Sequence, residues 1–291
     1  MNTGFNTIGI YGNHRHTNIQ DTLQILVDCL QQRQINLFLE TETADLCSLQ
    51  LPTYSMSQLA EYCDLLIVVG GDGSLLTAAR AAIQFDTPVV GINRGKLGFL
   101  ADILPQEVEI KINEILNGNY QIEQRFLLHA ELYQGEKLIY TSDALNDVAL
   151  LPGKLAHMIS FNIIVNDSLV CRQRADGLIV ATPTGSTAYA LSGGGPILHP
   201  QLNAIVLVPM FPHTLSSRPI VIDGSSRIKL NLANHAESPP CISCDGQERI
   251  LFNSDNHIII TQQPNKVRLI HPPSYNYYET LRVKLGWENR C

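Results

Sequence analysis

Residues 65–76 read Leu65-Leu66-Ile67-Val68-Val69-Gly70-Gly71-Asp72-Gly73-Ser74-Leu75-Leu76. The apolar residues at the start of this stretch are typical of a strand that is buried on both faces. The glycines then permit a tight turn, and Ser74 is expected to cap a helix over residues 75–85. A strand, a glycine turn and a helix N-terminus direct backbone N–H groups at one point, which suits a phosphate group.

Asp72 is the unusual residue of this turn. A carboxylate among phosphate-binding amides repels the ligand unless it holds a metal ion or accepts a proton. We therefore expect the phosphate to lie on Gly70, Gly71, Gly73 and Ser74, with Asp72 in a chemical role. The alternative for this stretch alone is an ordinary surface turn, because glycine turns are common.

Strands and helices alternate over the first hundred residues. The strand-like runs are residues 7–12, 35–39, 65–69 and 88–92, and the helical patterns are residues 18–32, 57–62, 75–85 and 105–116. This alternation predicts an α/β N-terminal domain over residues 1–122, with a doubly wound parallel sheet. In such sheets a ligand binds beyond the carboxyl ends of the strands, where residues 70–74 lie.

The pattern changes after residue 122. Short strand-like runs separated by Gly, Pro, Asn and Asp are typical of an antiparallel sandwich. The runs are residues 125–133, 137–142, 147–150, 158–165, 177–181, 204–208, 227–232, 250–260 and 267–270. We expect an all-β C-terminal sandwich domain over residues 123–271, and a helix within residues 272–291 that returns to the first domain.

The chain has 291 residues, 45% of them hydrophobic, and a formal net charge of −7. This charge argues against broad electrostatic binding to nucleic acid or to a membrane. Because no segment has the apolar length of a membrane span and the N-terminus lacks a signal-peptide pattern, we expect a cytoplasmic protein. The single pair Cys241-x-x-Cys244 can in principle bind a metal or be redox-active, but reduced structural thiols are the favoured interpretation.

A second informative block runs from Arg172 to Pro196 and includes Thr182-Pro183-Thr184-Gly185-Ser186-Thr187-Ala188-Tyr189. A buried strand leads into a loop of hydroxyl residues and glycine, which suits a ribose or a phosphate, and Tyr189 offers its ring to a base. The alternative is a flexible Ser/Gly loop, although the prolines on each side favour a fixed shape.

Asn146-Asp147 is a further candidate for nucleoside binding. An amide matches the edge of adenine, and a carboxylate accepts hydrogen bonds from ribose hydroxyls. By itself the dipeptide more often makes a turn. His157, near an apolar strand, is alone more often structural, and Asp245-Gly246-Gln247 is first interpreted as a hairpin turn.

Two common nucleotide-binding motifs are absent. Residues 91–97 resemble a Walker loop, but this run is one residue short and has Leu97 where Ser or Thr holds magnesium. No G-x-G-x-x-G opens a helix after a strand. P-loop enzymes and ordinary dinucleotide oxidoreductases are therefore excluded.

In combination these blocks closely resemble the NAD kinase family. The matching segments are residues 70–73, 91–100, 146–147, 176–196, 216–220 and 245–247. They follow in order over nearly the whole chain, and residues 176–196 are the most specific. The resemblance implies an α/β domain, a β-sandwich and a site between them. It also implies phosphoryl transfer from ATP to the 2′-hydroxyl of the adenosine ribose of NAD, which gives NADP. A divalent metal cofactor, expected to be Mg²⁺, and a homodimer or homotetramer are implied too.

The resemblance assigns roles to individual residues. It implies Asp72 as general base and Gly73 beside it on the nucleotide, which agrees with a triphosphate on Gly70, Gly71, Gly73 and Ser74; the metal ligands stay unknown. Asn146 and Asp147 are implied to hold the adenosine part of NAD, where Asp147 replaces a common Glu, just as Ser74 replaces a common Thr. The other NAD-binding residues implied are Gly73, His157, Arg174, Asp176, Thr187, Ala188, Tyr189, Ala190, Leu191, Ser192 and Gln247. Of these, His157, Arg174 and Asp176 match positions near a subunit interface.

Three alternatives stay open. Lipid kinases and 6-phosphofructokinases share a Gly-Gly-Asp-Gly turn, but the chain shows no evident membrane-facing surface, and phosphofructokinases lack the block over residues 176–196. A non-catalytic NAD(P)-sensing module would keep the regions of Asn146 and Tyr189 and would have no need of Asp72. The carboxylate therefore favours an enzyme.

Overall fold

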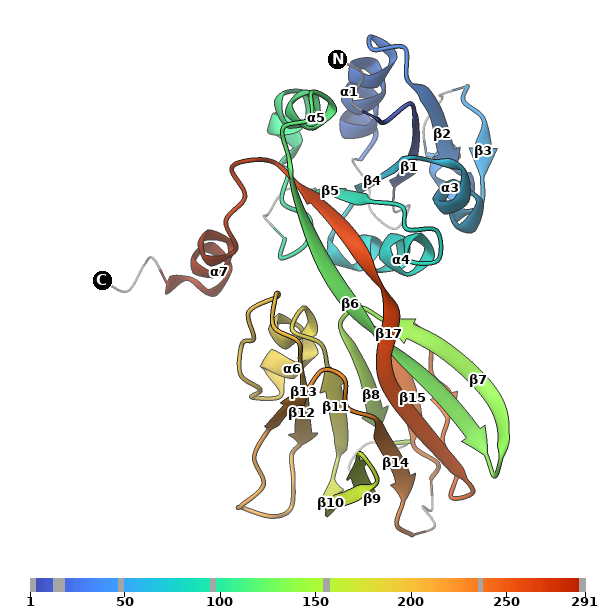
Figure 1. Cartoon of the computed structure of the whole chain (residues 1–291), viewed down its shortest axis with the longest axis vertical. Coiled ribbons are helices and arrows are strands. Elements are labelled where there is room, and N and C mark those ends of the chain that lie inside the picture. Colours follow the sequence, from blue (N-terminus) through green and yellow to red (C-terminus); the bar gives the residue numbers. More distant parts are fainter. Residues whose placement is uncertain are drawn as a thin grey trace. The chain divides into compact units, whose positions relative to one another are not determined.

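The structure is a computed structural model (Figure 1) that describes residues 4–12, 19–46, 50–94, 98–153, 158–234 and 238–287. The chain divides into two compact units, Met1–Gln124 with Asn265–Cys291, and Arg125–Pro264. The strands β6 and β17 carry the chain from one unit to the other.

The first unit contains a parallel sheet. Its strands are β1 (Thr7–Gly12), β2 (Asn36–Glu40), β3 (Thr53–Tyr54), β4 (Leu65–Val69), β5 (Val89–Ile92) and the end of β17 (Asn256–His271). They lie in the order β3-β2-β1-β4-β5-β17, and these pairings are parallel. The strands β2 and β3 follow each other on one side of β1, and β4 lies on the other side of β1. The strand order therefore reverses between β1 and β4, the kind of position at which such sheets bind ligands.

Helices cover both faces of this sheet, which confirms the predicted doubly wound arrangement. The helices of this unit are α1 (Gln20–Gln31), α2 (Thr41–Ala44), α3 (Met56–Tyr62), α4 (Asp72–Ala82), η1 (Pro105–Glu107), α5 (Val108–Leu116) and α7 (Tyr277–Leu285). Leu65 and Ile67 of β4 share a core with apolar residues of α1 and α5. On the opposite face, a Cβ added to Gly9 would meet Leu66 and Leu59, and α3 contacts α4 there.

The turn after β4 differs from the prediction in one respect. All residues of β4 are buried, as expected, but α4 begins at Asp72 with Gly71 at its N-cap. Ser74 is buried inside the first turn of the helix, so the prediction that it caps the helix is wrong. No side chain caps α4, because its N-cap residue is Gly71, and the carboxylate of Asp72 is bonded to the segment after β5.

The second unit is an antiparallel sandwich, as predicted. One sheet contains β6 (Gln121–Gln134), β7 (Lys137–Ala144), β9 (Ile159–Val165), β10 (Ser168–Ala175), β14 (Ile228–Leu232) and the start of β17. The other has the order β13 (Ile220–Asp223), β12 (Ala204–Met210), β11 (Gly177–Ala181), β8 (Asp147–Leu151), β15 (Cys241–Cys244), β16 (Ile250–Leu251). Phe161 and Ile260 of the first sheet share one core with Leu150 and Leu178 of the second.

Four features of this unit were not predicted. The strands β10 and β13 were missed because they end their sheets and expose most of their residues, which weakens the apolar pattern. The strand β15 is only four residues long. The two runs expected at 250–260 and 267–270 are instead the short strand β16 and one long strand, β17. Within the described part of the chain, no helix is both long and apolar enough to cross a membrane.

Candidate functional site

The Gly70–Ser74 turn lies at the carboxyl end of β4, beside the point where the strand order reverses. The Gly70 N–H donates to the Ile92 carbonyl at 2.9 Å, which fixes the turn to the neighbouring strand β5. The first hydrogen bond along α4 is from Ser74 N–H to the Gly71 carbonyl at 3.0 Å. The N–H groups of Asp72 and Gly73 precede it, and such groups at a helix N-terminus lack an acceptor within the helix.

Asp72 is held by three successive backbone amides of the segment after β5. Its Oδ2 accepts from Phe99 N–H at 2.9 Å, and its Oδ1 accepts from Leu100 N–H at 3.0 Å and Ala101 N–H at 3.2 Å. We call Phe99, Leu100 and Ala101 the amide clamp. A carboxylate has about four lone pairs, so among the described residues Oδ2 keeps one that can accept a proton. The clamp orients Asp72 without using up its capacity as a base.

The glycines around Asp72 divide into two kinds. A Cβ added at Gly71 or Gly73 would meet no atom within 4 Å among the described residues, and neither has a positive φ. The described fold therefore does not require glycine at these positions, and their backbone is open to close approach by a ligand. A Cβ at Gly98 would instead lie 2.3 Å from Asp72 Oδ1.

A second clamp of the same kind lies in the second unit. Asp245 follows β15, and its carboxylate accepts from Leu145 N–H at 3.0 Å, Asn146 N–H at 2.8 Å and Asp147 N–H at 3.2 Å. The turn from Asp245 to Gln247 joins the antiparallel pair β15 and β16, as the hairpin interpretation predicted. It brings together Asn146-Asp147 and Asp245-Gly246-Gln247, which are about a hundred residues apart in the sequence.

The environment of Asp147 strongly perturbs its carboxyl group. Only 5% of the residue is exposed. Burial, and after it the negative charge of Asp245, raises the pKa of Asp147 to about 7. A carboxyl group that titrates near neutral pH can exchange a proton with a bound ligand, and such groups are frequent at functional sites.

The block over residues 182–192 packs directly on Asn146. The Thr182 N–H donates to the Asn146 carbonyl at 2.9 Å, and a Cβ at Gly185 would lie 2.0 Å from the same oxygen. Ser186, fully buried, donates to Pro183 O at 2.6 Å and accepts from Leu198 N–H at 2.9 Å. These bonds give the block a defined shape, so the flexible-loop alternative does not hold.

Tyr189 begins the short helix α6 (Tyr189–Ser192), one residue after η2 (Gly185–Thr187), and is 42% exposed. Burial and the charge of Asp147 raise the pKa of the Tyr189 hydroxyl, while the charge of Arg249 lowers it. The tyrosine ring thus lies within the electrostatic reach of Asp147 and presents an exposed surface beside it.

Two family models match this chain. They are the ATP-NAD kinase N-terminal domain over residues 8–120 and the ATP-NAD kinase C-terminal domain over residues 145–272. A NAD kinase of Pseudomonas entomophila is 52% identical over 98% of this chain and 97% of its own length. A NAD kinase of Chromohalobacter salexigens is 50% identical over 98% of both chains.

The chain belongs to the NAD kinase family. It is thereby a member of the phosphotransferases with an alcohol group as acceptor, and the lipid-kinase and phosphofructokinase alternatives are set aside.

Two solved structures share the fold of this NAD kinase family member. The yeast NADH kinase complexed with NADH has a TM-score of 0.88 at 22% identity, over 99% of this chain and 89% of the other. The NAD kinase from Archaeoglobus fulgidus in complex with ATP has a TM-score of 0.73 at 23% identity, over 96% of this chain and 97% of the other.

For the remaining site residues implied by the NAD kinase resemblance, the structure gives the exposure and the position in the fold. Arg174 is exposed near the end of β10, and Asp176 is half-buried between β10 and β11. Gln247 is exposed on the hairpin turn, and His157 lies outside the described residues. The sequence reasoning missed the amide clamp and Asp245 as holders of site residues. The only signal available was that Phe99, Leu100 and Asp245 lie inside segments that resemble the family.

Cys241 and Cys244 do not form a joint site. They are three residues apart on the strand β15, so their side chains point to opposite faces of the sheet. Both are buried and unbridged, Cys244 lies in the sandwich core, and burial raises the pKa of the Cys241 thiol. They are structural thiols, as the favoured interpretation predicted.

Proposed function

We propose that this chain transfers a phosphoryl group from ATP to the 2′-hydroxyl of the adenosine ribose of NAD, with Asp72 as the general base. The observation that carries the proposal is the orientation of the Asp72 carboxylate by the amide clamp, with one lone pair of Oδ2 left for a proton. Phosphoryl transfer depends mainly on positioning and charge stabilisation. A pre-oriented acceptor for the hydroxyl proton supplies part of that positioning.

The ATP phosphates lie, in this proposal, on Gly70, Gly71, Gly73 and Ser74. The uncapped N-terminus of α4 and the open backbone at Gly71 and Gly73 support this assignment. Ser74 belongs to this turn through its backbone, but its side chain is buried and its N–H is bonded to the Gly71 carbonyl. The N–H groups of Asp72 and Gly73 are therefore the proposed donors to the phosphate.

The adenosine part of NAD binds, in this proposal, to Asn146, Asp147 and the block Thr187–Ser192, with Gln247 beside them. The clamp by Asp245 supports this assignment, since it fixes the backbone of Asn146 and Asp147, at the start of β8, to the turn between β15 and β16. The exposed ring of Tyr189 is the surface for the base. By the family resemblance, His157, Arg174 and Asp176 complete the contacts to the dinucleotide.

Mg²⁺ is the proposed metal cofactor. No cluster of three or more His, Cys, Asp or Glu side chains suited to a metal occurs in the described ranges. A Mg²⁺ ion fits this composition because it keeps several waters and is usually bound through substrate phosphates with few protein carboxylates. When bound, it neutralises charge on the triphosphate.

We further propose that the chain forms a homodimer or homotetramer through its edge strands and acts in the cytoplasm. Leu169 and Val170 of β10 are 64% and 41% exposed, and Ile220 and Val221 of β13 are 40% and 47% exposed. We call these four residues the edge-strand surface. Apolar side chains on the last strands of two sheets favour association with another chain. Arg174, implied to lie near a subunit interface, is on the same strand, β10.

The test of the catalytic assignment is Asp72→Asn, assayed for NADP formation from NAD, ATP and Mg²⁺. Loss of the proton acceptor should lower turnover roughly 10²–10⁴-fold. NAD binding measured by calorimetry should change by less than about tenfold, since the adenosine contacts remain. The control is Asp64→Asn, because Asp64 also accepts from two backbone amides, at 2.8 and 2.9 Å, in the same unit.

The control separates chemistry from folding. Asp64→Asn should lower the melting temperature about as much as Asp72→Asn does, and it should keep wild-type turnover. Near-normal turnover of a folded Asp72→Asn variant would contradict the assignment of Asp72 as the general base. Failure of the wild-type protein to form NADP at all would contradict the proposed reaction itself.

A further inference from the structure

The residue that follows the amide clamp, Asp102, belongs to a buried cluster of charges. Its side chain is 7% exposed, and its Oδ2 lies 2.9 Å from Nδ1 of His271, whose side chain is 2% exposed. On the other side of the imidazole, His271 Nε2 lies 3.3 Å from Oε2 of Glu123. Asp102, His271 and Glu123 come from the segment after β5, the end of β17 and the start of β6. We call these three residues the buried triad.

The surroundings of His271 fix both the orientation of its imidazole and its protonation state. The ring of Tyr275 stacks on His271 with centroids 3.9 Å apart and an interplanar angle of 10°. Burial lowers the pKa of His271, but the hydrogen bond to Asp102 and the charges of Asp102 and Glu123 raise it more, so the net direction is upward. The protonated imidazolium is thus the form that suits two flanking carboxylates.

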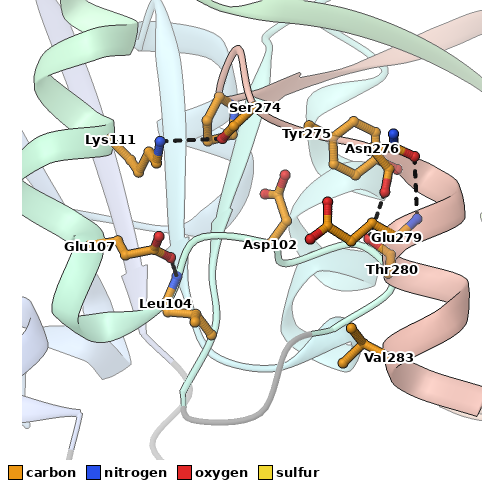
Figure 2. Close-up of a pocket in the computed structure, with 11 residues that line it drawn as sticks. Asp102, Leu104, Glu107, Lys111, Ser274, Tyr275, Asn276, Glu279, Thr280 and Val283 are labelled. Carbon is orange, nitrogen blue, oxygen red and sulfur yellow. Dashed lines mark hydrogen bonds between the residues drawn. The ribbon is translucent and has the colours of Figure 1, made fainter. Parts of the chain in front are cut away.

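Figure 2 shows Asp102 between the residues of η1 and α5 on one side and those of α7 on the other. They line a cavity of about 280 Å³, whose charged groups besides Asp102 are Glu107, Lys111 and Glu279. Lys111 is bonded to Ser274 at 3.2 Å and paired with Glu114 at 3.2 Å. His271 is therefore the cation that directly contacts Asp102 among the described residues.

The backbone on both sides of Asp102 is tied to β5. The Ala101 carbonyl accepts from Asn93 Nδ2 at 3.1 Å, and Ile103 exchanges hydrogen bonds with Gly91 and Asn93 at 3.3 and 2.7 Å. The buried triad adds a side-chain anchor at the residue next to the clamp. Buried ion clusters contribute little net stability, because desolvation offsets their attraction, and in some proteins they fix one specific arrangement of the chain.

We infer that His271 is a positioning residue for phosphoryl transfer: through Asp102 it fixes the amide clamp that orients Asp72. The inference rests on the proposed role of Asp72 as base. His271 touches neither substrate nor Asp72 in this account, and it acts only by holding the segment whose N–H groups define the direction of the carboxylate.

The test is a double-mutant cycle of His271→Gln and Asp72→Asn, with kcat measured for NADP formation. Glutamine keeps a hydrogen-bonding side chain but removes the cation between the carboxylates. In the wild-type background, His271→Gln should lower kcat by about 10²-fold, a loss that a misplacement of about 1 Å can cause. The KM values for NAD and ATP should change by less than about threefold. In the Asp72→Asn background the same substitution should cost less than about twofold, because the group it positions is already gone.

The matched control is His129→Gln. His129 Nδ1 lies 2.6 Å from Asp143 Oδ1 in the other unit, so the variant breaks a similar pair without a path to Asp72 through the clamp. Its kcat should stay within about twofold of the wild-type value. If His271→Gln does not fold, Glu123→Gln replaces it, since Glu123 lies on the Nε2 side of the imidazole and its loss weakens the hold on His271. For Glu123→Gln we expect a smaller loss of kcat, which again should occur only when Asp72 is intact.

Two results would overturn the inference. One is an unchanged kcat in the folded His271→Gln or Glu123→Gln variant. The other is an equal loss in both backgrounds, which would mean that the triad acts on general stability. A failure of the proposed function is distinct from both, because it appears as near-normal turnover of the Asp72→Asn single variant.

Discussion

Asp147→Asn should stabilise the ligand-free protein, although it removes a residue proposed to bind NAD. In the fold, burial and the charge of Asp245 disfavour the ionised form of Asp147 and raise its pKa from 3.8 to about 7. Asparagine has nearly the same size and carries no charge. The substitution therefore removes the free energy needed to keep a carboxylate in this site at neutral and alkaline pH.

The pKa values fix the sign and an upper limit for the effect. Below the unfolded pKa of 3.8 the carboxyl group is protonated in both states and does not affect stability. Between 3.8 and about 7 the unfolded chain loses the proton first, so the wild-type protein loses stability as pH rises, and above about 7 the loss is complete. At about 1.36 kcal/mol per pKa unit, the interval from 3.8 to about 7 corresponds to at most about 4 kcal/mol.

The measurement is the free energy of unfolding in urea for both proteins at about pH 5.5 and about pH 8. The advantage of Asp147→Asn should grow by about 2 kcal/mol between them, since the upper part of the titration lies in that interval. The control is Asp167→Asn, because the Asp167 side chain is 90% exposed and pairs with Arg227 at 3.4 Å, and such surface pairs are worth under about 1 kcal/mol. An advantage that is the same at both pH values, or a variant less stable than wild type at about pH 8, would refute the reasoning.

The remaining predictions concern the two ligands and the assembly. Asn146→Ala should weaken NAD binding in calorimetry by roughly 1–3 kcal/mol, the cost of an unpaired polar partner, and leave ATP affinity nearly unchanged; equal losses would mean that Asn146 contacts the other nucleotide. Gly73→Ala should raise the free energy of unfolding by roughly 0.5–1 kcal/mol, because glycine is a poor helix residue, and it should also raise the KM for ATP. Gly98→Ala should lower both stability and kcat, because its Cβ would meet Asp72 Oδ1. Similar effects of the two glycine substitutions would contradict the distinction between the open position of Gly73 and the crowded position of Gly98. Light scattering at micromolar concentration should find an oligomer for the wild type and a smaller species for Leu169→Glu, and a fully active monomeric wild type would count against shared sites.

Much of the fold was predictable because it depends on local patterns. The uninterrupted apolar run of β4 identifies a strand buried on both faces, and the glycines after it mark a turn at the carboxyl end. Alternation of such strands with amphipathic helices predicts a doubly wound sheet, and short alternating runs predict a sandwich. These signals lie within ten or so residues of each other, which is why sequence periodicity reports them. The matching segments from Gly70 to Gln247 also indicated the family that the comparisons found.

What the sequence alone did not determine is how the two key carboxylates are held. Asp72 is bound by amides 27 to 29 residues away, and Asp245 binds amides 98 to 100 residues away. The donors are backbone N–H groups, which every residue except proline carries, so no side-chain pattern marks them. The raised pKa of Asp147 and the buried triad likewise depend on burial among distant elements. Residue type decided which groups can act as acids, bases and ligands, and only the tertiary structure decided their neighbours, their exposure to water and hence their chemistry.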